Sequence, residues 1–362
     1  MISPSTSFTI LGAGLVGRLL AVELARKGHA VSVYDAGGPQ GEHAAAPVAA
    51  AMLAPLAESA ITEPSVVRMG HYSLPRWQQL LSGLKEPIFF QQEGTLIVWH
   101  RQDAADALHL RRKLEVNQAS VPELPAMEAV EGTRLASLEP ALAGRFAQAL
   151  YLPGEGQLDN RQLLSALVNA MEAHGVHLHW HSPRELSDCT KELSAPNHWV
   201  LDCRGLGART SWSTLRGIRG EVIRIQAPEV TLQRPTRLVH PRYPIYVAPK
   251  ENHVFVIGAT EIESEDLSPV SVRSALELLS AAYAVHPGFA EARILEMKTQ
   301  CRPTLADNLP ALRVPQDRVL QINGLYRHGF MIAPAMVDAA LQWLNTGQSS
   351  LATQFDLAIQ QE

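Results

Sequence analysis

The sequence predicts an α/β fold in which a Rossmann-like domain is interleaved with an antiparallel-sheet α+β domain. Three observations predict this arrangement. A glycine-rich turn joins a strand-like segment to a helix-like one at the start of the chain, a block at 220–258 is rich in β-branched residues and prolines, and segments suited to the first domain return after residues 140 and 300. We therefore expect a chain that leaves its first domain and re-enters it.

The first domain opens with a strand, a tight turn and a helix. Residues 7–11 are apolar and β-prone, and Gly12-Ala13-Gly14-Leu15-Val16-Gly17 leads into helical spacing that lasts to Ala25. In this pattern Gly12 permits the turn, Gly14 lets the backbone approach a pyrophosphate, and Gly17 lets the helix pack on the strand. The free N–H groups at the start of the helix suit phosphate, so the turn predicts a nucleotide site.

A second strand strengthens this interpretation. Gly28 is expected to end the helix, residues 29–34 form the next strand, and Asp35 follows about twenty residues after the turn, where an acid meets a ribose hydroxyl. A glycine-bearing turn alone is a weak signal, but here strand, helix, second strand and acid coincide. The motif does not choose between a flavin and a nicotinamide.

The segments between the first domain's pieces follow in order. Residues 65–84 predict a helix interrupted at Pro75, and 88–99 read as a hairpin centred on Glu93-Gly94. A charged helix is expected at 103–116, and Asp159 or Asn160 is expected to cap a helix that ends near Gly175.

The later elements complete the pattern. We expect strands at 176–181 and 199–203, an antiparallel sheet at 220–258 and a helix at 270–284. A strand ends at Asn323-Gly324, and Pro334 is expected to open a last helix that runs through Leu344. The predicted nucleotide-binding domain is therefore 1–86, 140–217 and 300–362, and the second domain is 87–139 and 218–299. This discontinuity favours a flavin, because nicotinamide dehydrogenases more often complete their nucleotide-binding domain contiguously.

Composition limits the possible partners. The chain has 362 residues, 46% of them hydrophobic, and 31 basic against 36 acidic side chains give a net charge of -5. This balance gives no reason to expect nucleic acid or an anionic membrane as a partner. The Ala-rich run at 44–57 contains two prolines and is too short to span a bilayer, so no integral membrane segment is expected. The composition leaves open whether the protein forms a homo-oligomer.

Neither cysteines nor histidines predict a metal or disulfide framework. The three cysteines, Cys189, Cys203 and Cys301, are scattered and lack CxxC spacing, which suits a reducing cytoplasm. His177, His179 and His181 alternate on one predicted strand face with His174 nearby. Side chains on one strand face project in parallel and no carboxylate or cysteine completes a shell, so we expect a polar face and no metal.

Three stretches could carry chemistry. The run at 44–57 is either a helix start or a small-residue backbone that lies against a flat ring. Arg302, directly before Pro303, either binds a substrate carboxylate through its paired donors or forms an ordinary surface ion pair. The segment 323–344 either aims a helix N-terminus at a cofactor or is a simple amphipathic helix.

Taken together, these blocks resemble the glycine oxidase and D-amino-acid oxidase family of FAD enzymes, and most closely its thiamine-pathway branch. The similarity covers nearly the whole chain and rests on eight blocks in order: GAGLVG, AAAMLAP, GQLDNRQLLSAL, LDCRGLGA, IRGEVIRI, YVAPK with VIGATEIE, CRPTLADNLP and GLYRHGFMIAP. Single blocks are loose, but their order and spacing are specific.

The resemblance implies which residues hold FAD and substrate. It places the ADP half on the 12–16 turn and Asp35, the ring against 50–52 and 325–331, and the adenosine half near Arg184. The implied cofactor-binding residues are Gly12, Ala13, Gly14, Leu15, Val16, Asp35, Ala36, Ala45, Ala46, Ala50, Ala51, Met52, Arg184, Gly205, Leu325, Arg327, His328, Gly329, Phe330 and Met331. The implied substrate-binding residues are Tyr246, Arg302, Arg327 and Met52. Ala51 departs from the family, which usually has glycine there.

The resemblance also implies a reaction. A small amino acid, glycine first, is expected to be oxidised to a 2-oxo acid with release of ammonia and hydrogen peroxide, in thiamine biosynthesis, with molecular oxygen as partner and no protein acid or base required. The alternatives are a D-amino-acid or sarcosine oxidase, a dehydrogenase that passes electrons to another acceptor, a non-catalytic flavin-binding partner subunit, and a nicotinamide enzyme.

Overall fold

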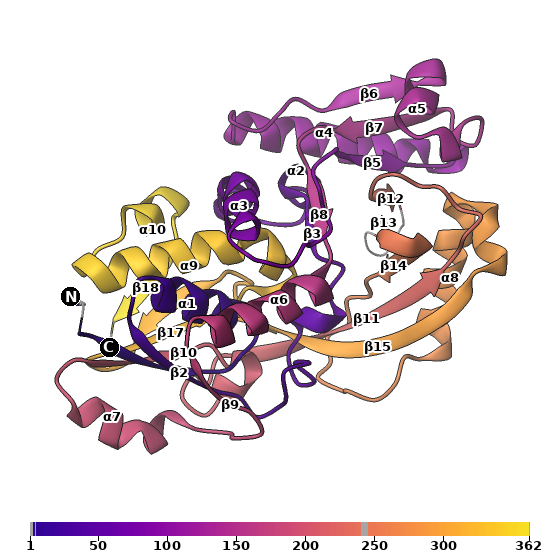
Figure 1. The fold of residues 1–362 in the computed structure, drawn as a ribbon. Coiled ribbons are helices and arrows are strands. Elements are labelled where there is room, and N and C mark those ends of the chain that lie inside the picture. Colours follow the sequence, from indigo (N-terminus) through magenta and orange to yellow (C-terminus); the bar gives the residue numbers. More distant parts are fainter. Residues whose placement is uncertain (1–2, 4, 240–244, 362) are drawn as a thin grey trace.

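The β1–α1–β2 unit at the start of the chain belongs to a seven-stranded sheet. In the computed structural model, which describes residues 3, 5–239 and 245–361, its neighbouring strands are in order β18 (Ala358–Gln361), β16 (Ala311–Val314), β17 (Val319–Asn323), β10 (His198–Asp202), β1 (Ser7–Leu11), β2 (Ala30–Tyr34) and β9 (His177–His179) (Figure 1). The strands from β17 to β9 are parallel, whereas β16 runs antiparallel to β17. The predicted α/β fold is confirmed.

The opening turn has the predicted geometry. Helix α1 (Leu15–Arg26) begins after Gly14, and Gly28 has a φ of 85° directly after the cap residue Lys27. Gly12 has a φ of 91°, and a Cβ on Gly17 would lie 1.9 Å from the Gly12 carbonyl oxygen. Both positions therefore require glycine, as the sequence predicts.

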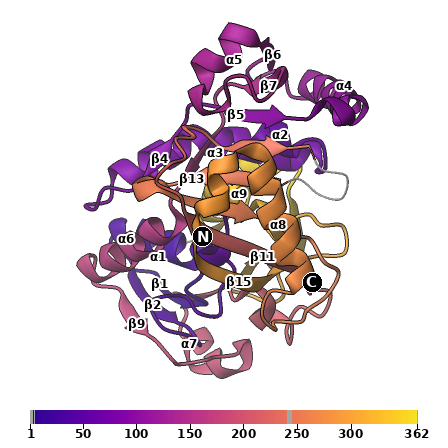
Figure 2. The same ribbon diagram turned by 90° about the vertical axis from the view of Figure 1, so that its right-hand side faces the viewer.

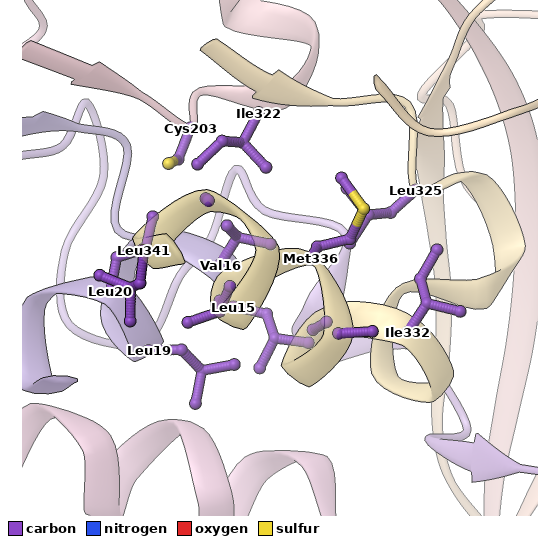
Figure 3. Packing of buried hydrophobic residues seen from close by; sticks show 14 of the residues in the cluster. Leu15, Val16, Leu19, Leu20, Cys203, Ile322, Leu325, Ile332, Met336 and Leu341 are labelled. Carbon is purple, nitrogen blue, oxygen red and sulfur yellow. The ribbon is translucent and has the colours of Figure 1, made fainter. Parts of the chain in front are cut away.

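Helices pack on this sheet around one large apolar core. It includes α1, α3 (Pro64–Ser82), α6 (Asn160–Ala173), α9 (Gly329–Thr346) and α10 (Ser350–Phe355). Figure 3 shows Leu20 of α1 beside Leu341 of α9, Met336 of α9 beside Leu325, and Ile322 of β17 beside Cys203, which follows β10. This packing fixes the ends of β1, β10 and β17 relative to the start of α9, where the candidate site lies. The short helix α7 (Thr190–Ser194) precedes β10.

The prediction that Pro334 opens the last helix is wrong. Helix α9 begins at Gly329, five residues earlier, and contains Pro334. A proline lacks the N–H that would bond to the carbonyl four residues back, here that of Phe330. The indole N–H of Trp77 donates to this carbonyl at 2.8 Å, so a side chain from α3 satisfies it.

The predicted interruption at Pro75 is also wrong. Helix α3 continues through Pro75 from Pro64 to Ser82. Its buried residues, among them Met69, Leu74 and Trp77, pack into the same core as α9. Tertiary burial therefore outweighs the loss of one helical hydrogen bond.

The second sheet has eight strands. In spatial order these are β15 (Arg293–Thr304), β11 (Arg216–Gln226), β14 (Val254–Gly258), β13 (Ile245–Pro249), β12 (Thr236–Leu238), β5 (Thr95–Val98), β7 (Gln148–Leu152) and β6 (Glu128–Glu131). The predicted antiparallel sheet is present within 220–258, apart from 240–244, which lie outside the described residues. Only the β12 and β5 pair is parallel among the described strand pairs of this sheet. Helix α8 (Val272–Val285) covers β11, β13 and β14 (Figure 2).

The predicted hairpin at 88–99 is wrong. Strand β4 (Phe90–Gln91) pairs with β8 (Gly156–Leu158) in a three-stranded sheet that also contains β3 (Met52–Leu53), whereas β5 pairs with β7 and β12. The chain turns at Gly94, whose φ is 81°, but it passes from one sheet to another there. The local turn signal was correct, and the partners of the two strands are distant in sequence.

Several boundaries differ slightly from prediction. Helix α4 (Ala104–Ser120) extends four residues past the predicted end, and α2 (Pro55–Glu58) and α5 (Gly132–Leu138) are short additional helices. Asp159, not Asn160, caps α6, because its side chain accepts from the backbone N–H groups of Arg161 and Gln162. Within the described part of the chain, no helix is long and apolar enough to cross a membrane.

Candidate active site

A cavity of about 430 Å³ lies where the two large sheets meet. Its lining comes from the β1–α1 turn, the run before β3, strands β13 and β15, and the segment between β17 and α9. All the residues that the sequence analysis implied for FAD or substrate line it except Ala13. The Ala13 N–H instead donates to Asp35 Oδ2 at 2.6 Å, which ties the turn to the end of β2.

One end of the cavity suits a dinucleotide. Helix α1 has no side-chain cap at its N-terminus, so its first N–H groups are open to an anion. A Cβ on Gly14 would lie 4.0 Å from its nearest neighbour, the Ala44 Cβ, so the glycine leaves open space at the cavity wall. Backbone donors and open space are what a pyrophosphate requires, and the site therefore fits the ADP half of FAD.

Two arginines shape this end. Arg18 is buried and donates to the carbonyls of Ala13, Leu164 and Pro39, at 2.7, 2.7 and 2.9 Å. Burial lowers the pKa of Arg18 to about 10 although Asp35 lies nearby. Arg184 lies over the Tyr34 ring at 4.5 Å and pairs with Glu192 at 2.8 Å. Arg18, whose charge interrupts the apolar run of α1, is not among the residues expected at the site from the sequence.

The small-residue run at 44–57 is not α-helical before Pro55, where the short helix α2 begins. It forms a 3-10 turn at Ala46–Val48, then extended backbone, and Ala51 takes a left-handed conformation with a φ of 55°. Glycine adopts this conformation without strain, which gives a physical reason for glycine at this position in the family. The carbonyl of Ala50 accepts from Lys250 Nζ at 3.1 Å, and the carbonyl of Ala51 accepts from the Leu158 N–H at 3.2 Å.

At the other end of the cavity, Glu58 is the centre of a buried polar cluster. Its carboxylate accepts a short hydrogen bond from the Tyr246 hydroxyl and lies 3.1 Å from Arg327 Nε. His328 Nδ1 lies 3.6 Å from the same carboxylate. Burial alone would raise the pKa of Glu58, but the charges of Arg327 and Arg237 outweigh burial and lower it to about 2, so the group is ionised.

Glu58 is not among the residues expected at the site from the sequence. A signal was present, since it is an acidic residue at the end of an apolar run that was itself singled out at 44–57. Glu261, within the quoted VIGATEIE block, was also given no role, yet its carboxylate pairs with Arg327 Nη1 at 2.6 Å.

Arg302 and Arg327 both line the cavity, but only Arg327 is paired with carboxylates of the described residues. Arg327 pairs with two carboxylates, those of Glu58 and Glu261. Arg302 donates to two backbone carbonyls, that of Arg219 at 3.3 Å and that of Thr260 at 3.0 Å, and forms no salt bridge with any described residue. Burial, with Arg327 close by, lowers the pKa of Arg302 to about 10, so it is a cation at neutral pH.

The predicted histidine face holds no metal cluster. Among residues 3, 5–239 and 245–361, no group of three or more histidine, cysteine, aspartate or glutamate side chains could hold a metal ion. The His179 ring stacks on Tyr34 with centroids 4.2 Å apart, so this histidine packs against the neighbouring strand β2.

Comparison with known proteins gives consistent matches. The family model described as DAO, FAD dependent oxidoreductase, matches residues 7–343. A Rhizobium etli protein named as a thiamine biosynthesis oxidoreductase ThiO is 38% identical over 338 residues, 93% of this chain and 96% of that protein. A Geobacillus kaustophilus glycine oxidase is 27% identical, over 90% of this chain and 89% of its own length. The crystal structure of glycine oxidase from Geobacillus kaustophilus shares the fold, with a TM-score of 0.77 over 97% of this chain and 98% of that chain at 21% identity.

Proposed function

Because the chain belongs to the DAO family of FAD-dependent oxidoreductases, we propose that it oxidises glycine or another small amino acid. The proposed reaction converts the amino acid, O₂ and water into the 2-oxo acid, ammonia and hydrogen peroxide. The names of the Rhizobium etli and Geobacillus kaustophilus relatives support this substrate class and a place in thiamine biosynthesis.

FAD, when bound, supplies the two-electron acceptor for this oxidation. The residues proposed to hold it are those of the nucleotide end, with the α1 N-terminus and Gly14 at the pyrophosphate. The segments 50–52 and 325–331 are proposed to hold the ring. We assign Ala13 an indirect role, because its N–H fixes Asp35 and it does not line the cavity.

One observation carries the substrate assignment. Arg302 is a partly buried cation that faces the cavity with only neutral carbonyl partners among the described residues, so a carboxylate entering the cavity would satisfy it. Tyr246, Arg327 and Met52 are proposed as neighbours of the substrate. The Tyr246 hydroxyl already donates to Glu58, so we assign the carboxylate chiefly to Arg302.

No side chain is proposed as a general acid or base. Glu58, with a pKa of about 2, stays ionised at neutral pH and is held in its ion pair. Burial lowers the pKa of His328 to about 4, so this imidazole is neutral. The residues of this cluster therefore bind and orient, and positioning supplies their contribution to the rate.

Steady-state kinetics of Arg302→Met with glycine test this proposal. We expect the KM for glycine to rise roughly 100-fold or more, because a charge-assisted, paired hydrogen bond is lost. Arg216→Gln is the matched control, since Arg216 lies in the paired strand β11, bonds to Glu263 at 2.8 Å and does not line the cavity. An unchanged KM in Arg302→Met would refute the carboxylate assignment.

We also propose a cytoplasmic enzyme that uses O₂, which a peroxide assay on purified protein tests. We also propose two discontinuous domains, with one adjustment to their predicted bounds. The nucleotide-binding domain was expected at 1–86, 140–217 and 300–362, and the second domain at 87–139 and 218–299. Strand β7 (Gln148–Leu152) hydrogen-bonds into the eight-stranded sheet, which supports assigning it to the second domain. Homo-oligomerisation stays a prediction that sedimentation can test.

A further inference from the structure

Two guanidinium groups, those of Arg302 and Arg327, face the substrate end of the cavity, and of these only Arg302 is free of an ion pair with the described residues. Arg327 lies between Glu58 at 3.1 Å and Glu261 at 2.6 Å. Arg302, close enough to Arg327 to feel its charge, bonds only to carbonyl oxygens among the described residues. At this end, the cavity therefore offers one unpaired positive charge although two arginines line it.

Glu58 is responsible for much of this difference. Its side chain is 9% exposed, whereas that of Glu261 is 39% exposed, so Glu58 is the buried partner of Arg327. A buried ion pair whose remaining acceptor sites are satisfied is held firmly. Here the Tyr246 hydroxyl occupies the second carboxylate oxygen of Glu58.

The backbone of Glu58 is also fixed. Its N–H bonds to the Ala54 carbonyl at 3.0 Å. The preceding residue, Ala57, donates its N–H to Glu155 Oε1 and accepts from Arg237 Nη1, both at 2.8 Å. The backbone that carries the carboxylate is therefore fixed, and rotation of the side chain away from Arg327 would break the hydrogen bond from Tyr246.

The charge balance has a consequence for substrate choice. A monocarboxylic amino acid brings one carboxylate, which matches the unpaired Arg302. A dicarboxylic amine would bring a second negative charge into a cavity where Arg327 is already neutralised and Glu58 repels it. If Glu58 lost its charge, Arg327 would keep only the more exposed Glu261 as an anionic partner, and its Nε would become available to that second carboxylate.

We propose that Glu58 is a specificity-determining residue that restricts the site to monocarboxylic amino acids by occupying Arg327. This inference rests on the proposed function, because it assumes that the cavity receives the substrate carboxylate at Arg302. Glu58 acts through Arg327, so it is a positioning residue and does not itself contact the reacting atoms.

Binding of unreactive acids to the FAD-loaded protein tests this directly. Acetate and malonate differ by one carboxylate, and calorimetry measures their dissociation constants without turnover. In Glu58→Gln we expect the affinity for malonate relative to acetate to rise at least 10-fold over wild type. The Gln carbonyl can still accept from Tyr246, whereas its amide cannot pair with Arg327. A parallel rise in kcat/KM for iminodiacetate relative to glycine is expected.

Two further variants keep the test decisive. Glu261→Gln removes the more exposed partner of Arg327 and should raise the preference for malonate over acetate by a smaller factor. This variant tests the proposal if Glu58→Gln does not fold. Glu58→Gln combined with Arg327→Met should lose the gain. A purely structural role for Glu58 would lower both affinities and would not create a preference for malonate.

The outcomes separate this inference from the proposed function. If neither Glu58→Gln nor Glu261→Gln gains preference for malonate while wild type oxidises glycine, the role of Glu58 is wrong and the function stands. If wild type oxidises no amino acid, the function is wrong, and the acetate and malonate constants still decide whether Glu58 withholds Arg327.

Discussion

The indole N–H of Trp77 in α3 donates to the carbonyl oxygen of Phe330 in α9 at 2.8 Å. This carbonyl is the one that Pro334 leaves without a helical donor. The two bonded residues are 253 positions apart in sequence, so the bond joins distant helices. Phe330 itself belongs to the 325–331 segment that lines the cavity. A single side chain thus completes the first turns of α9.

Removing this donor should destabilise the protein. In Trp77→Phe the buried carbonyl of Phe330 loses its partner, and we expect the free energy of unfolding to fall by about 1–3 kcal/mol from this loss, with a further cost for the smaller ring. Urea unfolding measures the change. Pro334→Ala restores a backbone N–H that can bond to the Phe330 carbonyl. Its effect on the free energy of unfolding should therefore be more favourable in the Trp77→Phe background than in wild type. If the two effects simply add, Trp77 is not the partner that replaces this N–H.

Glu155 should make stability depend on pH. Burial raises the pKa of this carboxyl to about 7, above the 4.5 of an ordinary glutamate, so the folded protein binds more protons than the unfolded chain between these values. Stability from this group is therefore present below pH 4.5 and is lost as the pH rises through 7. The free energy of unfolding of Glu155→Gln, measured relative to that of wild type, should therefore increase by roughly 3 kcal/mol from pH 5 to pH 8. A constant difference at both pH values would contradict this.

Ala51 should tolerate glycine better than a comparable buried alanine does. Both Ala51 and Ala54 are buried, but Ala51 has a φ of 55° whereas Ala54 has a φ of -130°. Relief of left-handed strain offsets the entropy cost of glycine only at Ala51. We expect Ala51→Gly to cost at least about 1 kcal/mol less than Ala54→Gly in thermal unfolding. Equal costs would mean that Ala51 is not strained.

Two glycines should separate cofactor binding from folding. Gly14 has a negative φ of -71° and open space toward the cavity, so Gly14→Ala should leave the apoprotein's stability nearly unchanged but weaken FAD binding roughly 10-fold or more. Gly28 has a φ of 85° and faces no nearby atoms. Gly28→Ala should therefore cost about 1 kcal/mol of stability and keep the FAD affinity. Flavin fluorescence titration of the apoproteins measures the affinities, and the reverse pattern would refute the nucleotide site.

Local signals predicted the elements whose causes are local. The β1–α1–β2 unit, Gly28 after α1 and Asp159 before α6 depend on residues a few positions apart, and all are confirmed. The start of α9 depends on Trp77, and the pairing of β4 and β5 depends on strands far along the chain, so these predictions failed. The residue types around the cavity could be predicted, but the pairing of Arg327 with Glu58 and Glu261 required the fold.

The visible spectrum of the purified protein during anaerobic addition of glycine tests the central claim most directly. We predict a yellow protein whose flavin absorbance glycine bleaches without oxygen, with a glycine requirement raised roughly 100-fold in Arg302→Met. A colourless protein that takes up no FAD, or a flavin that no small amino acid bleaches, would contradict the account.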